Sequence, residues 1–355
     1  MLIQSVSYGQ SIDSKLRFNG KYVGGLNGTV PDYYSPYKDI RATYVISNGI
    51  DFINSVNKLK SGDIIYIPGE KLINLSGYKN LKIPSNVKII GDRGQNGSKG
   101  ALLYTTSSDV QPLFEVVGNN VTFYGIRIRG EDGEKLRKED SFKNKSKRYI
   151  DDNYLKLYNE NMYSSPVSTA IATFANNLIV ENCEIYQWTN NGVYFKKGSV
   201  GGIVRYCYIH HNQRFGLGYG VTTNQAEILV EGNLFNFNRH SIASTGRVNS
   251  IYVVRGNIFK EGGNESWAVD MHGGKDKKEG NNIAGTKLEV NNNIFYLKGK
   301  AKAVVVRGVP VNPSTVHKNK IIYLDNRRTY GKNSFSQYNG KGNFRFFDNE
   351  IIERK

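Results

Sequence analysis

A short pattern of apolar residues followed by Asn or Gly returns through the second half of the chain at a nearly constant interval. Its equivalent positions are Cys183, Cys207, Asn233, Asn257 and Asn293, separated by steps of 24, 26, 24 and 36 residues. A weaker copy, Phe346 to Ile351, lies near the end of the chain. A period near 25 residues, built from short apolar strands and Asn/Gly turns, indicates a solenoid whose coils stack on one another.

The length of one repeat indicates what each coil contains. About 25 residues leave no room for crossover helices, so three short strands joined by turns predict an all-β parallel β-helix rather than a leucine-rich repeat. Asn233, Asn257 and Asn293 are expected to form a side-chain hydrogen-bond ladder inside one turn. Cys183 and Cys207 are expected to stack as buried thiols, about 4.8 Å apart, rather than to form a disulfide or a metal site.

The start of the chain predicts an arm and then a cap. Residues 1–45 are expected to form an irregular N-terminal arm, and residues 46–355 one solenoid domain. Ser47 or Asn48 can cap a short helix that covers the open end of the apolar column. A strand is expected at 64–67, before Pro68-Gly69. Two excursions from the solenoid are expected, at 131–163 and 311–343.

The chain resembles the pectin-lyase-like superfamily in the order of its first elements, which are the helix, Gly62-Asp63, the strand 64–67 and Pro68-Gly69, followed by the repeats. This resemblance covers roughly residues 45–351 and implies a right-handed parallel β-helix with an N-terminal capping helix. The superfamily holds polysaccharide lyases, uronan epimerases, glycoside hydrolases and phage tailspike depolymerases. Unrelated sites occur on this one solenoid, so the reaction stays open at this point.

The charge of the chain points to an anionic partner. The formal net charge is +17, and residues 166–330 carry 20 Lys/Arg against 11 Asp/Glu. An acidic polysaccharide is the expected partner, while nucleic acid is less favoured because a rigid solenoid with clustered histidines suits sugar chemistry better. No membrane contact is expected, since no apolar run of 18 residues occurs. The start of the chain lacks a signal-peptide pattern, and a monomer that is extracellular or particle-associated is expected.

Four of the five histidines lie between residues 210 and 272. Strict alternation along the segment 267–272 predicts that Trp267 points inward while Asp270 and His272 point outward. Counting along the coils predicts one outward row, Lys196, Tyr219, Arg247, Asp270 with His272, and Arg307, and predicts that Arg214 stacks beside His240. The expected catalytic residues are Tyr219, Arg239, His240, Arg247, Asp270 and His272. The expected substrate-binding residues are Lys196, His211, Arg214, Lys275 and Arg307.

A cationic row with Tyr and His at its centre fits a polysaccharide lyase that acts by β-elimination on a uronic acid. An Arg or Lys would neutralise the sugar carboxylate, and His, Tyr or Lys would remove the C5 proton. A uronan C5-epimerase needs nearly the same residues. A glycoside hydrolase needs two carboxylates about 5 to 10 Å apart, of which only Asp270 is plainly offered.

Two further alternatives concern binding. A non-catalytic glycan-binding β-helix of the tailspike or adhesin type would use the same basic surface. Asp270, Asp276 and Glu279 leave room for calcium, but the lysines around Asp276 argue against a metal. No essential cofactor is therefore expected.

Overall fold

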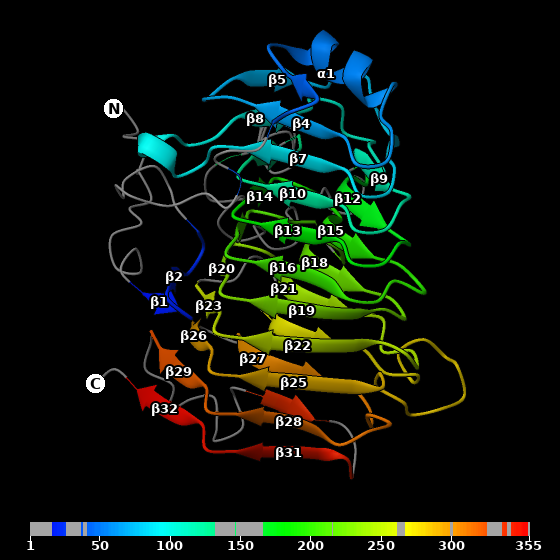
Figure 1. Cartoon of the computed structure of the whole chain (residues 1–355). Coiled ribbons are helices and arrows are strands. Elements are labelled where there is room, and N and C mark those ends of the chain that lie inside the picture. Colours follow the sequence, from blue (N-terminus) through cyan, green and yellow to red (C-terminus); the bar gives the residue numbers. More distant parts are fainter. Residues whose placement is uncertain are drawn as a thin grey trace.

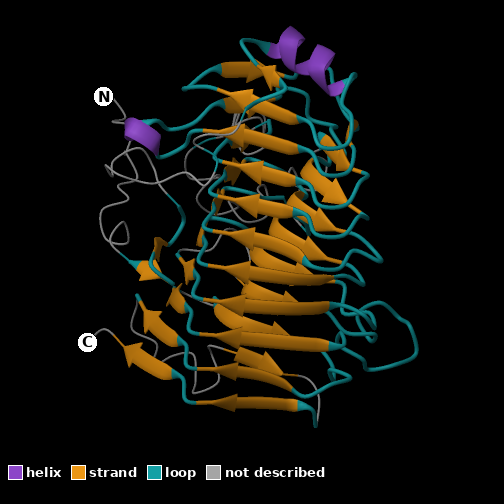
Figure 2. Cartoon of the chain, viewed as in Figure 1, coloured by secondary structure: helices purple, strands orange, loops and turns teal. Residues whose placement is uncertain are grey.

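The computed structural model describes residues 16–25, 37, 41–131, 146, 166–214, 216–260, 267–298, 301–324, 336–338 and 342–353. Within these residues the chain winds into a right-handed parallel β-helix, in which each coil supplies one strand to each of three parallel sheets (Figure 1). The all-β fold class predicted from the repeat is confirmed (Figure 2).

Sheet I, which will carry the candidate site, has nine described strands. They are β6 (Leu81–Ile83), β9 (Phe114–Val116), β12 (Thr169–Thr173), β15 (Asn191–Phe195), β18 (Tyr219–Thr223), β21 (His240–Ser244), β24 (Trp267–Met271), β27 (Lys302–Val306) and β30 (Ser336–Tyr338).

Sheet II follows sheet I along each coil. Its described strands are β3 (Tyr44–Val45), β4 (Ile64–Ile67), β7 (Lys88–Gly91), β10 (Thr122–Tyr124), β13 (Ile179–Glu181), β16 (Gly202–Arg205), β19 (Glu227–Glu231), β22 (Ile251–Arg255), β25 (Lys287–Asn291), β28 (Ser314–His317) and β31 (Phe344–Phe347).

Sheet III completes the coil. Its described strands are β5 (Leu72–Asn74), β8 (Leu102–Tyr104), β11 (Arg127–Arg129), β14 (Glu184–Tyr186), β17 (Tyr208–His210), β20 (Leu234–Asn236), β23 (Ile258–Phe259), β26 (Ile294–Leu297), β29 (Lys320–Tyr323) and β32 (Glu350–Glu353).

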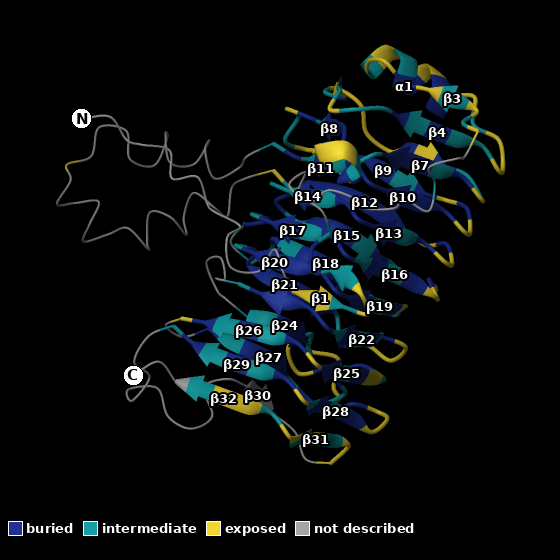
Figure 3. Ribbon diagram, turned by 60° about the vertical axis from the view of Figure 1, so that its left-hand side comes forward, coloured by how far each residue is buried: buried dark blue, intermediate teal, exposed yellow. Residues whose placement is uncertain are grey.

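Equivalent apolar residues of successive coils stack into a continuous core inside the three sheets. Buried residues recur along the strands of successive coils (Figure 3). In sheet III, the rings of Phe235, Phe259 and Phe295 stack with centroids 5.0 and 4.6 Å apart. Each coil buries only its own share of this core, so the stability of the solenoid grows with the number of stacked coils.

The turn between sheets II and III holds the predicted ladder. The Asn257 side-chain oxygen accepts hydrogen bonds from the backbone N–H and the side-chain amide of Asn233, at 2.9 and 3.0 Å. The same pattern continues through Asn293, Asn319 and Asn349. Cys207 and Cys183 occupy this position in earlier coils as buried free thiols, as predicted.

The helix α1 (Gly49–Val56) covers the N-terminal end of the core, above β5 (Figure 1). The Asn48 side chain caps it by accepting the Asp51 N–H at 3.0 Å. Phe52, Ile53 and Val56 point into the column, which would otherwise end in exposed apolar side chains. Both the helix α1 and the strand β4 match the sequence prediction. Among the described residues, no helix has the length and apolar character needed to cross a membrane.

Part of the N-terminal arm lies against the solenoid. The hairpin of β1 (Arg17–Phe18) and β2 (Lys21–Tyr22) is followed by Val23, which packs on Leu234 and Ile258 of sheet III. The Gly24 N–H donates to the Gly232 carbonyl at 2.8 Å. Lys21 pairs with the buried carboxylate of Glu181 at 2.9 Å. These contacts join the arm to several coils.

The two expected excursions differ in outcome. The stretch 311–343 was expected to leave the solenoid, yet β28, β29 and β30 lie within it and form a further coil with its own ladder residue, Asn319. The coil does not stand out in the sequence because Lys318 precedes Asn319, where Gly or Asn precedes the ladder asparagine in the regular copies. The excursion at 131–163 lies outside the described residues, apart from Glu131 and Ser146.

Candidate functional site

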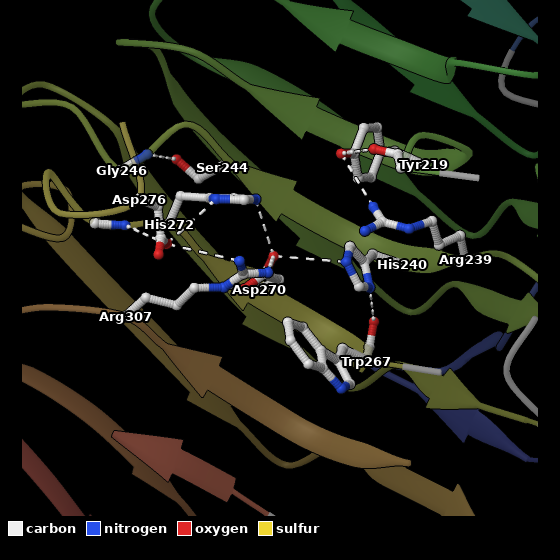
Figure 4. Close-up of polar contacts among 12 residues, drawn as sticks. Tyr219, Arg239, His240, Ser244, Gly246, Trp267, Asp270, His272, Asp276 and Arg307 are labelled. Carbon is white, nitrogen blue, oxygen red and sulfur yellow. Dashed lines mark hydrogen bonds and ion pairs between the residues drawn. The ribbon is translucent and has the colours of Figure 1, made fainter. Parts of the chain in front are cut away.

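A group of polar side chains lies on the outer face of sheet I, along β18, β21, β24 and β27 (Figure 4). The strand pairing skips the second residue of each of these strands. A side chain at one such position, Gly220, would point at Ile209 and Phe235 in the core. This irregularity turns the first residue of each strand outward, so that Tyr219, His240 and Trp267 share the outer face with Asp270.

Asp270 is the centre of the group. Its carboxylate is completely buried and accepts two hydrogen bonds from the Arg307 guanidinium, at 3.0 and 2.6 Å. Burial by itself raises the pKa of Asp270, but the hydrogen bond from His272 and the charges of His240, His272 and Arg307 outweigh it and lower this pKa to about 2. Asp270 is therefore ionised at neutral pH, although it faces outward under other side chains rather than into solvent.

His272 is the member of the group that reaches solvent. Its side chain is 24% exposed, and its Nε2 lies 3.2 Å from Asp270 Oδ2. Its Nδ1 lies 3.5 Å from the carboxylate of Asp276, which is itself partly exposed. A carboxylate only accepts hydrogen bonds at neutral pH, and Asp270 is the nearer of the two carboxylates and is hydrogen-bonded to His272. Asp270 therefore favours the tautomer of the neutral ring that carries the proton on Nε2, which leaves Nδ1 as the atom that can accept a proton.

His240 has a different environment. Its ring is completely buried, Nδ1 donates to the Trp267 carbonyl at 3.1 Å, and Nε2 lies 3.6 Å from Asp270 Oδ2. Burial lowers the pKa of His240 to about 3, against the opposing effect of the Asp270 charge. A neutral ring without exposed surface packs and positions its neighbours. The expectation that His240 acts directly on substrate therefore does not fit this burial.

Trp267 was predicted to point inward and does not. The Arg307 guanidinium carbon lies 4.6 Å from the centroid of its ring, and the His240 ring stacks on it at 5.3 Å. Val269 and Met271 do point into the core, as predicted. The irregular second residue of the strand, which strict alternation ignores, accounts for the difference.

Tyr219 and Arg239 form a second polar pair beside His240. Arg239 Nη1 donates to the Tyr219 hydroxyl oxygen at 3.1 Å, and the hydroxyl donates to the Gly216 carbonyl at 3.0 Å. Arg239 is buried, whereas Tyr219 is partly exposed. The rings of Tyr219 and His240 lie 5.7 Å apart, which joins this pair to the Asp270 group.

The predicted row is corrected by the strand register. In the next coil Tyr219 pairs with His240, not with Arg247, and His240 does not stack beside Arg214. Arg214 instead bridges to Leu217 within the preceding turn. Lys196, His272 and Arg307 do hold equivalent places, each directly after a strand of sheet I.

The remaining predicted residues lie farther from Asp270. Arg247 is exposed and pairs at 2.7 Å with Glu279, which lies on the turn formed by residues 272–286. Lys275 is exposed on the same turn. His211 stacks on Phe237 beside His210, directly after β17.

Asp276 and Lys277 belong to the group and were not among the predicted site residues. Asp276 contacts both His272 and Arg307. Half-burial and the nearby charge of Arg247 lower the pKa of Lys277, while Glu279, Asp276 and Asp270 oppose the shift. The sequence does contain a sign of this turn, because the step between Asn257 and Asn293 is 36 residues long and the other steps are 24 to 26. The added residues form the turn that carries Asp276 and Lys277.

This arrangement supplies a solvent-reaching imidazole between two carboxylates, with cationic side chains around it. Such a ring can accept a proton at Nδ1, and the neighbouring carboxylates stabilise the imidazolium that results. Within the described part of the chain, no three His, Cys, Asp or Glu side chains gather in a way that could hold a metal ion.

A family model described as "Right handed beta helix region" matches residues 85–283, which is more than half of the chain. No curated protein matches the sequence.

Several solved structures are similar at low identity. A hyperthermoactive exopolygalacturonase from Thermotoga maritima is 12% identical, with a TM-score of 0.54, over 86% of this chain and 88% of that one. A DFA-IIIase from Arthrobacter chlorophenolicus A6, without its lid, is 12% identical, with a TM-score of 0.52, over 94% and 90% of the two chains. The match to a Family 28 exopolygalacturonase from Yersinia enterocolitica, with 12% identity and a TM-score of 0.47, covers 93% of this chain but only 64% of that one. At these identities the likeness concerns the fold.

Proposed function

Because the chain belongs to the family of proteins with a right handed beta helix region, whose solenoid also carries polysaccharide-active enzymes, we propose that it cleaves an acidic polysaccharide by β-elimination. The observation that carries this proposal is the environment of His272. Its ring reaches solvent, while its two nitrogen atoms lie 3.2 Å from the carboxylate of Asp270 and 3.5 Å from that of Asp276.

In the proposed reaction, His272 Nδ1 removes the C5 proton of a uronic acid residue. The electrons of the C5–H bond form the C4–C5 double bond, the C4–O bond breaks, and the leaving oxygen takes up a proton from the His272 imidazolium or from water. Asp270 orients the ring through Nε2, and Asp276 stabilises the imidazolium. Arg307 keeps Asp270 ionised rather than binding the sugar, because its Nε and Nη2 already donate to that carboxylate.

The positive charge that β-elimination needs comes in this proposal from the turn after β24. Lys275 and Lys277 flank Asp276 there, and a cation next to the sugar carboxylate makes the C5 proton easier to remove. A C5-epimerase would use the same residues and return the proton to the opposite face of the ring.

Hydrolysis is the second candidate, because two carboxylates lie on either side of His272. One of them argues against it: the buried Asp270 has a pKa of about 2 and cannot act as the acid that protonates a leaving group. Only Asp276 would remain for that role.

The test is to incubate the protein with alginate, polygalacturonate, glucuronan and glycosaminoglycans. β-Elimination on one of them is expected to produce the ultraviolet absorbance of an unsaturated uronide. New reducing ends without this absorbance would establish hydrolysis instead. Uptake of deuterium at C5 without cleavage would establish an epimerase, and retention on a glycan without any reaction a binding protein.

A further inference from the structure

A row of side chains lies directly after the strands of sheet I, and His272 is one member of it. Backbone hydrogen bonds place Lys196, Asn224, Thr245, His272 and Arg307 at equivalent positions in successive coils. Phe174 precedes them, since Thr173 pairs with Phe195 in the register. We call these six residues the exit row.

The exit row runs parallel to the axis of the solenoid, so its members follow one another at the strand spacing of about 4.8 Å. Lys196 therefore lies roughly 14 Å from His272, three strand spacings toward the N-terminus. One pyranose unit of an extended glycan advances by a length similar to one strand spacing. A polysaccharide lying along this row would place about one sugar on each coil.

The N-terminal end of the exit row carries a cation on an aromatic platform. Phe174 is 54% exposed, which is unusual for so large an apolar side chain. The Lys196 ammonium lies 4.3 Å from the centroid of the Phe174 ring and 6.0 Å from that of Tyr194. Among the described residues, no carboxylate lies within ion-pair distance of Lys196.

The middle of the row differs from both ends. The Thr245 hydroxyl donates to the Asn224 side-chain oxygen at 2.8 Å, and both side chains are partly exposed. These neutral groups offer hydrogen bonds to sugar hydroxyls and add no charge. The exit row thus has a charged aromatic end, a polar middle and the reactive end at His272.

We propose that Phe174, Lys196 and Tyr194 form a distal subsite for the carboxylate and the ring face of a uronic acid, about three sugars from the residue on which His272 acts. The aromatic rings supply an apolar surface for the sugar face, and the ammonium supplies the counter-charge. This proposal rests on the proposed function and adds to it a direction and a minimum length for the substrate.

The test uses dimers to octamers of galacturonate and of mannuronate/guluronate with Lys196→Met. This variant keeps the apolar stem of the side chain and removes its charge. For the longest oligomers, kcat/KM is expected to fall about tenfold through KM, while the shortest oligomers that are cleaved show no change. Phe174→Ala is expected to show the same dependence on length.

Lys197→Met is the matched control, because Lys197 is the exposed neighbour of Lys196 outside the exit row and carries the same charge. An equal loss in Lys197→Met, or a loss in Lys196→Met that does not depend on oligomer length, would overturn the subsite. If wild type cleaves none of these oligomers and none of the four polysaccharides named above, the proposed function fails. Affinity electrophoresis in gels that contain polygalacturonate or alginate then decides the subsite, since Lys196→Met must lose retardation that Lys197→Met keeps.

Discussion

At the scale of single residues, His272 and His240 lie against the same carboxylate and have opposite environments. His272 reaches solvent, whereas His240 is sealed beneath Tyr219 and Trp267. Both histidines fell into one cluster in the sequence, where nothing separates them. Burial, which depends on the register of neighbouring coils, is the reason why the proposed mechanism gives the proton transfer to His272 and only a positioning role to His240.

Replacing His272 by Gln tests the proposed proton acceptor. Glutamine preserves a polar contact to Asp270 but has no group that can take a proton from carbon. We expect kcat on the cleaved polysaccharide to fall by about 10²- to 10⁴-fold, with an unchanged melting temperature. His317→Gln, on β28 of sheet II, serves as the control and should keep full activity. A His272→Gln variant with more than half of the wild-type kcat would remove His272 from the mechanism.

His240 predicts how stability depends on pH. Its pKa is about 3 in the fold and 6.5 ordinarily, so between these values the unfolded chain binds a proton that the folded chain does not. The free energy of unfolding must therefore fall as the pH drops through this window, by about 2 kcal/mol between pH 7 and pH 5. The depressed pKa of Asp270 acts at lower pH: its contribution is present above 3.8 and is lost as the pH falls through about 2.

The measurement is chemical denaturation at pH 7 and pH 5 for wild type and for His240→Asn. Asparagine can still donate to the Trp267 carbonyl from the place of Nδ1, but it does not titrate. The variant is expected to lose less stability than wild type between the two pH values. Equal losses would mean that another group causes the acid sensitivity.

At the scale of the elements, the asparagine ladder is a continuous structure rather than a set of separate turns. Asn257 accepts from two donors of Asn233 and itself donates to Val230 and to the next residue of the ladder, Asn293. All of these groups are buried, so water cannot replace a missing partner.

Asn257→Ala is therefore expected to lower the free energy of unfolding by about 3 kcal/mol, since it leaves buried donors without an acceptor. Asn349→Ala removes the same side chain from the last, partly exposed coil, where water can take over its hydrogen bonds. Its expected cost is about 1 kcal/mol. Urea denaturation of the two variants compares them directly, and similar losses would refute the cooperative ladder.

The elements also show which features of the fold could be predicted from the sequence. Local patterns of apolar residues and turn residues were sufficient to predict most of the coils, the ladder and the capping helix, although the coil that carries Asn319 was missed. The outward row was not predictable from them. Tyr219 comes 12 residues after Cys207, but His240 comes only seven after Asn233, because the turn between sheets III and I varies in length. Counting from the ladder therefore gives the wrong register on the far side of that turn.

At the scale of the whole molecule, the positive charge and the candidate site belong to the same coils. The excess of nine positive charges in residues 166–330 lies on the repeats that supply the exit row and the Asp270 group. Fixed charges on a rigid solenoid act together at a distance, so they raise the local concentration of a polyanion before any specific contact forms.

This long-range attraction predicts that KM depends on salt, whereas the proposed chemistry at His272, and with it kcat, does not. At physiological ionic strength the screening length falls to about 8 Å, which weakens attraction between exposed charges but affects the pair of buried Asp270 and partly exposed Arg307 much less. Raising the salt concentration from low to physiological levels should therefore increase KM for a long polyuronate severalfold and leave kcat nearly unchanged. A short oligomer that does not reach Lys196 should show a smaller increase. A fall in kcat with salt, at constant KM, would instead place the sensitive charges inside the reacting group.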